Sequence, residues 1–254
     1  YITNILSKVY KYHMKILAVQ NRMGIGDTVI FLPFIKALSK KFNSPISILV
    51  KENSKADQYL HQTNYIDEII LLKRDKKKDN RHGGFLGSFH LIKDIKKHNF
   101  DKIIIFNSSF RFNLIAKFSG IPETYQYPLF QKSRQHITDV PRKFIKNKFD
   151  LVVNEDPEVQ IDDVLISKSI KRFKINKNEM NILLGVGGSG PTKRIPSKTF
   201  LSVIEKISKV KKCKFFLATG KNNEEQIILN EILQSKFKEL CIPLDSFSIK
   251  ETLP

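Results

Sequence analysis

Residues 15–33 read KILAVQNRMGIGDTVIFLP. The apolar run 16–19 is typical of a strand in a parallel sheet, and Gly24 and Gly26 permit a tight turn after it. Apolar residues at helical spacing follow that turn. Asp27 is therefore predicted near a helix start at the carboxyl end of a strand, where open α/β sheets bind ligands. Because Asp is also a preferred cap residue, helix capping alone remains an alternative role for Asp27.

The composition is that of a globular protein, with 41 % hydrophobic and 10 % aromatic residues in 254. This length suggests one large or two small domains, and we expect two. No run of 18 uncharged apolar residues is present to span a bilayer. Residues 1–14 form a short amphipathic segment without a signal-peptide cleavage site. Cys213 and Cys241 lack any zinc-binding spacing, which favours a reducing, cytoplasmic location.

The formal net charge of +19 arises from 44 basic and 25 acidic residues. Such an excess predicts attraction to polyanions such as phosphorylated lipid, nucleotide or nucleic acid. Lys, Ile and Asn are all abundant in the chain, so genomic base composition is an alternative source of part of this charge. The sign of the charge is informative, but it does not identify the ligand.

Strands and helices are predicted to alternate along the first 130 residues. We expect strands at 16–19, 46–50, 66–72, 102–106 and 124–127, with helices after the first strand and at 55–63, 85–98 and 110–118. The basic loop 73–84 lacks periodicity and is expected to be mobile and solvated. This pattern predicts one Rossmann-like domain.

A second βα series is predicted after a charged crossover segment, residues 128–180. The crossover is expected to hold helices at 142–149 and 164–173; strands at 181–186 and 214–219, helices at 197–210 and 223–234, and a short strand near Leu240 complete the series. We expect an N-terminal domain at 15–160 and a C-terminal domain at 161–254. Because the second series has only two complete βα units, we expect this domain to be incomplete, in a chain truncated at its C-terminus.

The glycine-rich segment 185–190 matches G-x-G-x-x-G, but the match is a weak indication of a dinucleotide site. Pro191 and Pro196 delay the next helix, and the next strand ends without an acid for a ribose hydroxyl. Small residues followed by Thr192 and Lys193 can instead hold a diphosphate through backbone N–H groups, a hydroxyl and an ammonium. A solvated basic turn is the alternative for this segment.

Two kinds of transfer chemistry lack their usual sequence motifs. No D-x-D triplet is present, which disfavours metal-dependent sugar transfer. The serines and histidines show no nucleophile-elbow spacing, so covalent serine catalysis has no support.

Segments 23–33 and 187–196, together with Asn64-Tyr-Ile-Asp-Glu-Ile-Ile70, resemble the heptosyltransferases of glycosyltransferase family 9. These are inverting enzymes that build the lipopolysaccharide core. The resemblance implies a GT-B-like α/β fold with two facing Rossmann-like domains, the acceptor held by the first and an ADP-sugar by the second. The sequence departs from the family pattern at Ile195, which replaces an aromatic residue, and by lacking the later motif Asp-Thr/Ser-Gly-x-x-His.

The resemblance also assigns roles to individual residues. It implies Asp27 as the catalytic base and Lys193 as a ligand of the donor diphosphate, in a loop that also contains Gly187, Gly188, Ser189 and Thr192. It implies transfer, with ADP-heptose as the expected donor, without a metal or a further cofactor.

For the acceptor, we expect an acidic glycolipid at the inner face of the cytoplasmic membrane, which a protein of this kind would contact peripherally. The residues expected to bind it are Gly24 and Gly26 beside Asp27, and the basic side chains Lys76, Lys77, Arg81 and Arg134.

Two other functions remain open at this point. A nucleotide-sugar epimerase can be built on the same two-domain fold. A basic nucleic-acid-binding protein fits the charge, but the sequence lacks an aromatic and basic RNA platform or a recognition-helix motif, so we expect no nucleic-acid partner.

Overall fold

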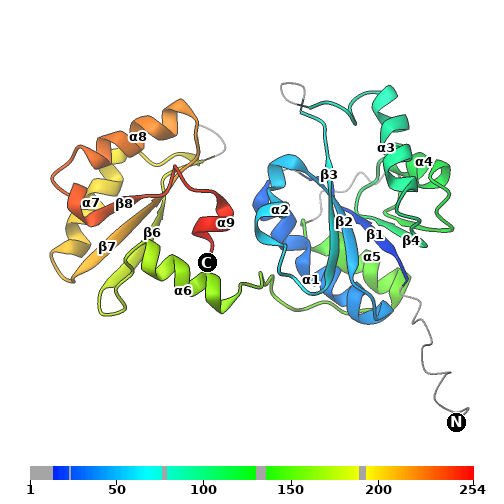
Figure 1. The fold of residues 1–254 in the computed structure, drawn as a ribbon, viewed down its shortest axis with the longest axis horizontal. Coiled ribbons are helices and arrows are strands. Elements are labelled where there is room, and N and C mark those ends of the chain that lie inside the picture. Colours follow the sequence, from blue (N-terminus) through cyan, green and yellow to red (C-terminus); the bar gives the residue numbers. More distant parts are fainter. Residues whose placement is uncertain (1–13, 23, 76–78, 130–135, 189–192) are drawn as a thin grey trace, which may run out of the picture. The chain divides into compact units, whose positions relative to one another are not determined.

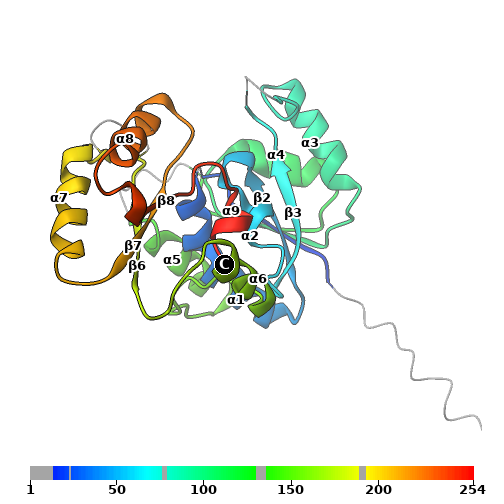
Figure 2. The ribbon, with the colours of Figure 1, turned by 60° about the vertical axis from the view of Figure 1, so that its left-hand side comes forward.

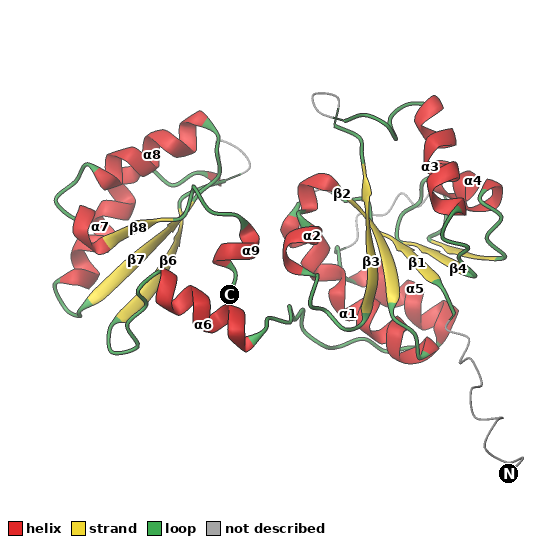
Figure 3. Ribbon diagram, in the orientation of Figure 1, coloured by secondary structure: helices red, strands yellow, loops and turns green. Residues whose placement is uncertain are grey.

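The computed structural model describes residues 14–22, 24–75, 79–129, 136–188 and 193–254. The chain divides into two compact units, residues 1–160 and 161–254, which are described separately (Figure 1). Both units are α/β structures built on parallel sheets, as Figure 3 shows by its colouring. Within the described residues, no helix is both long and apolar enough to cross a lipid bilayer.

Unit 1 contains a five-stranded parallel sheet in the order β3-β2-β1-β4-β5. The strands are β1 (Ile16–Val19), β2 (Ile46–Lys51), β3 (Ile66–Leu72), β4 (Lys102–Ile105) and β5 (Glu123–Gln126). The helices are α1 (Ile25–Phe42), α2 (Ala56–Tyr59), α3 (Leu86–Lys96), α4 (Phe110–Phe118) and α5 (Asp139–Phe149), with a 3₁₀ turn at Glu52–Ser54.

The central strand β1 is buried on both faces of the sheet. Each of its residues is at most 1 % exposed, as expected for a strand with helices on either side. Leu17 and Val19 belong to a core cluster that includes Leu91 of α3 and Phe112 and Ile115 of α4. These two helices therefore cover one face of the sheet.

The opposite face of the sheet is covered by α1 and α5 (Figure 2). Phe106, which follows β4, makes edge-to-face contacts with Phe31 of α1 and with Phe144 of α5. Such aromatic pairs add to the stabilisation that area burial provides. The sheet therefore lies between two helical layers.

The one clear departure from the predicted elements of unit 1 concerns the helix expected at 55–63. The structure has a 3₁₀ turn at Glu52–Ser54 and a single helical turn, α2, at Ala56–Tyr59. Lys55 lies between them with a left-handed φ of 54°, which interrupts the helical hydrogen bonds. The backbone leaves helical geometry again at Leu60.

The expected crossover 128–180 is shared by the two units. α5 packs within unit 1, and the extended segment after it remains attached there. Glu155 pairs with Lys36 and Lys40 of α1 at 3.3 and 3.0 Å, and the Gln160 side chain accepts a hydrogen bond from the Asn64 backbone. The next helix, α6 (Asp163–Arg172), belongs to unit 2.

Unit 2 contains a three-stranded parallel sheet in the order β6-β7-β8. Its strands are β6 (Met180–Gly185), β7 (Cys213–Ala218) and β8 (Cys241–Pro243). Its helices are α6, α7 (Ser197–Ser208), α8 (Asn223–Leu233) and α9 (Ile249–Thr252), with a 3₁₀ turn at Lys238–Leu240.

Alternate residues of β7 supply two small cores on the two faces of this sheet. Phe215 and Leu217 pack with Ile204 of α7 and Leu229 of α8, whereas Phe216 belongs to a separate cluster with Leu244. The β7 strand is thus central and buried on both sides. The loops that follow β6 and β7 leave the same edge of the sheet.

Candidate functional site

The turn between β1 and α1 holds Asp27 close to the end of the central strand. Gly24 adopts a φ of 102°, a conformation that favours glycine, and occupies the cap position of α1. The buried Gln20 side chain donates to the Asp27 backbone carbonyl at 2.9 Å and accepts from the Arg22 backbone N–H at 2.8 Å. These bonds fix the path of the chain from strand to helix.

The Asp27 carboxylate is not the cap of this helix. Asp27 is the third residue of α1, and α1 has no side-chain hydrogen bond at its cap. Among the described residues, the carboxylate has neither a hydrogen bond nor an ion pair. It lies near Gly24, since a Cβ built there would be 3.6 Å from Asp27 Oδ2. The alternative that Asp27 serves only as a cap therefore has no support in its contacts.

Neither packing nor backbone conformation requires a glycine at position 26, in the first turn of α1. A Cβ built on it would meet nothing within 4 Å, and its φ is in the ordinary range. Glycine inside a helix costs about 1 kcal/mol relative to alanine. The missing side chain leaves open space at this position of the turn.

Four cations follow the strands of unit 1 along the same edge of the sheet. Arg22 follows β1, Lys51 ends β2, Arg74 follows β3 and Arg111 lies in the first turn of α4 after β4. Since neighbouring parallel strands end at a common edge, the strand order places these side chains in a row that includes the Asp27 turn. Sequence reasoning missed this row because its members are spread over some 90 residues of the chain.

The pKa shifts show that three of these cations interact. Burial, together with the charge of Arg74, lowers the pKa of Lys51. The same two causes lower the pKa of Arg111. The Arg111 side chain is held in place by the His82 carbonyl, at 2.6 Å, and by Ser88 Oγ, at 2.9 Å. Arg74 therefore lies close enough to Lys51 and to Arg111 for their charges to interact.

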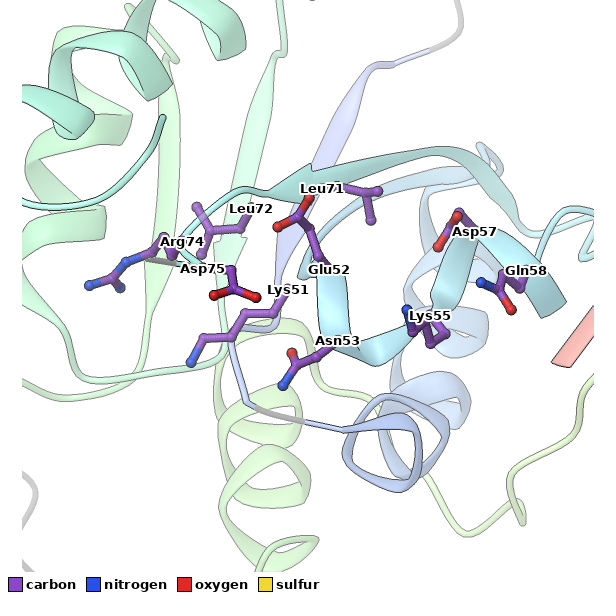
Figure 4. Close-up of a pocket in the computed structure, with 10 residues that line it drawn as sticks. All are labelled: Lys51, Glu52, Asn53, Lys55, Asp57, Gln58, Leu71, Leu72, Arg74 and Asp75. Carbon is purple, nitrogen blue, oxygen red and sulfur yellow. The ribbon is translucent and has the colours of Figure 1, made fainter. Parts of the chain in front are cut away.

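A pocket of about 600 Å³ opens at this edge, between the ends of β2 and β3 and the segment 51–58 (Figure 4). Its charged lining consists of Lys51, Lys55 and Arg74 together with Glu52, Asp57 and Asp75. In Figure 4 the Lys51 and Arg74 side chains extend toward the same side of the pocket. The pocket is polar and suits a hydrophilic ligand better than an apolar one.

The described part of the basic loop 73–84 is anchored to α3, in contrast to the expected solvated loop. Arg81 donates two hydrogen bonds to Asp94, each at 2.9 Å. The buried His82 contacts Asp94 through Nε2 at 3.2 Å, and its Nδ1 accepts from the Lys73 backbone N–H at 3.1 Å. The Arg81 guanidinium holds the pKa of Asp94 well below its usual range. Arg81 is thus engaged in fixing the loop.

In unit 2, the loops after β6 and β7 are joined by one buried carboxylate. Glu225, in the first turn of α8, accepts from the Gly188 backbone N–H at 2.9 Å and from the Gly220 backbone N–H at 2.8 Å. Asn222 caps the helix by accepting from the Glu225 backbone N–H at 2.9 Å. A carboxylate on backbone amides at a helix N-terminus occupies the kind of position that suits an anion.

Close packing around these amides accounts for two of the glycines in the loop after β6. A Cβ on Gly188 would lie 2.8 Å from the Lys193 carbonyl oxygen, and one on Gly187 would lie 3.0 Å from the Glu225 carboxylate. Both glycines had been predicted to face a donor. The Gly188 N–H instead bonds to Glu225, so it is not available to a diphosphate in this state.

Lys193 is the predicted donor ligand that the structure leaves accessible. Its side chain is exposed, and it has no ion pair within the described ranges. The neighbouring Arg194 instead pairs with Glu224 of α8. The two adjacent cations thus differ in role. Arg194 anchors the loop to α8, whereas Lys193 is exposed to solvent.

Several predicted site residues lie outside the described residues. These are Lys76, Lys77, Arg134, Ser189 and Thr192. Asp27 with the two glycines of its turn belongs to unit 1, and Gly187, Gly188 and Lys193 belong to unit 2. Each unit therefore brings its own members of the predicted site together.

Comparison with solved structures shows the fold. The glycosyl transferase family 9 protein from Veillonella parvula matches with a TM-score of 0.75 and 18 % identity, over 94 % of this chain and 72 % of that one. The E. coli ADP-heptose LPS heptosyltransferase II matches at 0.68 and 15 % identity, over 94 % of this chain and 75 % of that one. The E. coli heptosyltransferase WaaC with ADP matches at 0.64 and 12 % identity, over 93 % and 77 %.

No family model and no curated protein matches the sequence. The structural matches confirm the predicted GT-B-like α/β fold, and they confirm at the level of the fold the resemblance to heptosyltransferases. At sequence identities of 12 to 18 %, these matches show a shared fold and nothing more.

The Glu225 bridge gives a first testable prediction. Glu225→Gln replaces one accepting oxygen by an NH₂ group, which leaves one of the two glycine N–H groups without an acceptor. We expect a loss of about 1–3 kcal/mol in the free energy of unfolding, measured by urea denaturation of unit 2. Glu231→Gln, an exposed substitution in the same helix, should change it by less than about 0.5 kcal/mol. Equal effects of the two substitutions would show that the bridge is not formed.

His82 gives a prediction about pH. Burial lowers the pKa of His82 below its value in the unfolded chain, so the folded state binds the proton less readily. Its contribution to stability is therefore present above the unfolded pKa of about 6.5 and is lost as pH falls through the folded value. We expect His82→Asn to flatten the pH dependence of the free energy of unfolding between pH 7 and 5, measured by urea denaturation, by at most about 1.4 kcal/mol per pH unit. The exposed His61→Asn should retain the wild-type slope.

Proposed function

We propose that this chain is a glycosyltransferase that moves a sugar from a nucleoside diphosphate to the hydroxyl of an acidic glycolipid. The transfer inverts the anomeric carbon and needs no metal. ADP-heptose is the proposed donor, and a lipopolysaccharide core is the proposed acceptor. The fold supports the proposal, because heptosyltransferase II and WaaC, which share it, are named for transfer of heptose, the latter with ADP bound.

The observation that carries the proposal is the carboxylate of Asp27, which has no hydrogen bond or ion pair with any residue that the structure describes. Asp27 accepts no hydrogen bond from the described residues, so its carboxylate is not engaged by the first turn of its own helix. The space left by Gly26 lies in the same turn. Both features suit an acceptor hydroxyl that approaches the carboxylate closely.

The chemical step follows from these groups. The acceptor oxygen attacks the anomeric carbon of the donor as the bond from that carbon to the diphosphate oxygen breaks. The bonding electrons leave with the nucleoside diphosphate, and Asp27 takes the proton of the attacking hydroxyl. Negative charge therefore grows on the diphosphate, where a fixed cation stabilises the transition state by about 3 kcal/mol. Lys193 is the cation that we assign to this role.

The acceptor is proposed to carry an acidic group because of the cations of unit 1. Lys51 and Arg74 line the pocket at the carboxyl ends of β2 and β3. Burial and, second to it, repulsion by Arg74 lower the pKa of Lys51 and of Arg111. A phosphate or carboxylate on the acceptor would relieve this repulsion. This site replaces Arg81, which is engaged by Asp94, as the proposed anion contact.

The catalytic role of Asp27 is tested by Asp27→Asn. We expect the release of ADP from ADP-heptose, with a lipopolysaccharide core as acceptor, to fall by about 10²- to 10⁴-fold. The affinity for ADP, measured by calorimetry, should stay within about twofold because the base does not contact the nucleotide. Asp163→Asn, a substitution in the first turn of α6, is the matched control and should leave turnover unchanged. Near-normal turnover of Asp27→Asn would remove Asp27 from the mechanism.

The role of Lys193 is tested by Lys193→Met, which keeps the length of the side chain and removes its charge. We expect ADP to bind about tenfold or more weakly, since a charge-assisted contact contributes about 1.5–3 kcal/mol. Lys206→Met removes the same charge from an exposed site on α7 and should not change ADP affinity. If the two variants bind ADP equally well, Lys193 is not a donor ligand.

Reactions with the donor alone distinguish the proposed transferase from a nucleotide-sugar epimerase. A transferase releases ADP only when an acceptor is present, apart from slow hydrolysis. An epimerase converts the sugar of the donor without an acceptor and without net release of the nucleotide. Proton NMR of the donor in the absence of acceptor distinguishes these outcomes.

A further inference from the structure

Helices α3 and α4 expose a group of large apolar side chains to solvent. The exposed fractions of these residues run from 36 to 79 %, and the residues are Phe85, Leu86, Phe89, Phe110, Leu114 and Phe118. The buried sides of the same helices carry other apolar residues, among them Leu91 and Phe112. Apolar side chains therefore occur on both sides of α3 and α4, and the outer set has no role in the core of unit 1.

We call the outer surface of the two helices, which carries these six residues, the α3–α4 face. The two helices lie side by side in both views (Figures 1 and 2), and Arg111 Nε donates to Ser88 Oγ at 2.9 Å across their contact. At helical spacing, Leu114 and Phe118 follow Arg111 by three and seven residues, on the side of α4 nearest α3.

Phe85 and Phe89 are placed in the same way on α3. Phe85 precedes Ser88 by three residues, and Phe89 follows Phe85 by four. Their rings make an edge-to-face contact with centroids 5.2 Å apart. By this spacing, Phe85 and Phe89 of α3 and Leu114 and Phe118 of α4 lie on the sides of the helices nearest the Arg111–Ser88 contact.

The α3–α4 face is also basic. Segments 85–97 and 110–118 contain five basic residues, Lys93, Lys96, Lys97, Arg111 and Lys117. The one acidic residue in these segments is Asp94, which is engaged by Arg81 and Lys97. Lys93 and Lys117 are exposed; Lys93 follows Phe89 by four residues and Lys117 directly precedes Phe118 in the sequence. Exposed aromatic residues rimmed by lysines match the interface of an anionic bilayer, where rings enter the headgroup region and cations meet lipid phosphates.

We propose that the α3–α4 face docks unit 1 on the surface of an anionic phospholipid bilayer. This inference rests on the proposed function, in which the acceptor is a glycolipid. Charge complementarity favours a bilayer over a second copy of this chain, since two copies of a basic surface would repel each other. The starts of α3 and α4 lie at the edge of the sheet that holds the Asp27 turn. A lipid-borne acceptor could thus keep its acyl chains in the bilayer while its sugar reaches that edge.

The test is co-sedimentation with vesicles in the absence of any donor. Vesicles of phosphatidylcholine with 30 mol % phosphatidylglycerol should bind the protein about tenfold or more tightly than pure phosphatidylcholine vesicles. The variant Phe85→Ser/Phe89→Ser/Phe118→Ser should bind the anionic vesicles about tenfold or more weakly. Val152→Ser/Val210→Ser/Ile227→Ser, which removes three equally exposed apolar side chains elsewhere, should bind as the wild type does.

A second variant keeps the test valid if the triple serine variant does not fold. Lys93→Gln/Lys117→Gln should weaken binding to anionic vesicles by about fivefold per lysine and leave the weak binding to neutral vesicles unchanged. Unaltered vesicle binding by both variants overturns the proposal. So does a wild-type dimer, detected by sedimentation velocity, that the triple serine substitution converts to a monomer without a change in vesicle binding.

The measurements separate this inference from the proposed function. ADP affinity is determined for the wild type and for every variant, and none of the substituted residues lies in the Asp27 turn or the Lys193 loop. Wild-type ADP binding without any vesicle binding would refute the docking surface and leave the transferase proposal intact. Vesicle binding that depends on the α3–α4 face, without any affinity for ADP, would support the surface and refute the proposed donor.

Discussion

The parallel register of the sheets is the constraint from which the candidate site follows. β1 pairs with β2 on one side and β4 on the other, and all of these strands run in the same direction. Helices must then carry the chain back along the faces, so every strand of a unit ends at one edge. No layer of side chains covers that edge. Groups that are far apart in sequence, such as Arg74 and Arg111, come close enough there for their charges to interact.

The two units use carboxylates at this edge in opposite ways. Asp27 and Glu225 both lie in the first turn of a helix that follows a strand, and both are the third residue of that helix. Glu225 is buried and accepts two backbone N–H groups, whereas Asp27 accepts none from the described residues and remains partly exposed. The same position in a helix therefore holds a structural carboxylate in one case and an available one in the other.

The sequence predicted the elements well because the buried strands are short, strongly apolar runs. The strands at 16–19 and 66–72 and the helix at 110–118 have the bounds that periodicity predicts, and most others differ by one to three residues. The prediction was wrong where local backbone geometry overrode periodicity, as at Lys55. It also placed Asp27 correctly at the end of a strand, since a glycine turn between strand and helix is a local signal.

The remaining features of the site depend on contacts that no local pattern reveals. The partners of Glu225 are Gly188 and Gly220, and the first of these is 37 residues away. In the sequence, an acid at that position is typical of a residue that only favours a helix start. Arg81 was predicted to bind acceptor because it belongs to a run of basic residues. Its pairing with Asp94 becomes visible only when α3 is folded against the loop.

The bridge made by Glu225 has a mechanical consequence. One rigid carboxylate group is shared by two loops, so a displacement of the loop that carries Gly188 pulls on the loop that carries Gly220. The two loops are therefore coupled and should rearrange together, through the N-terminus of α8. A ligand that competes for the Gly188 N–H would have to displace Glu225 first, and the freed carboxylate could then accept a hydroxyl group from that same ligand.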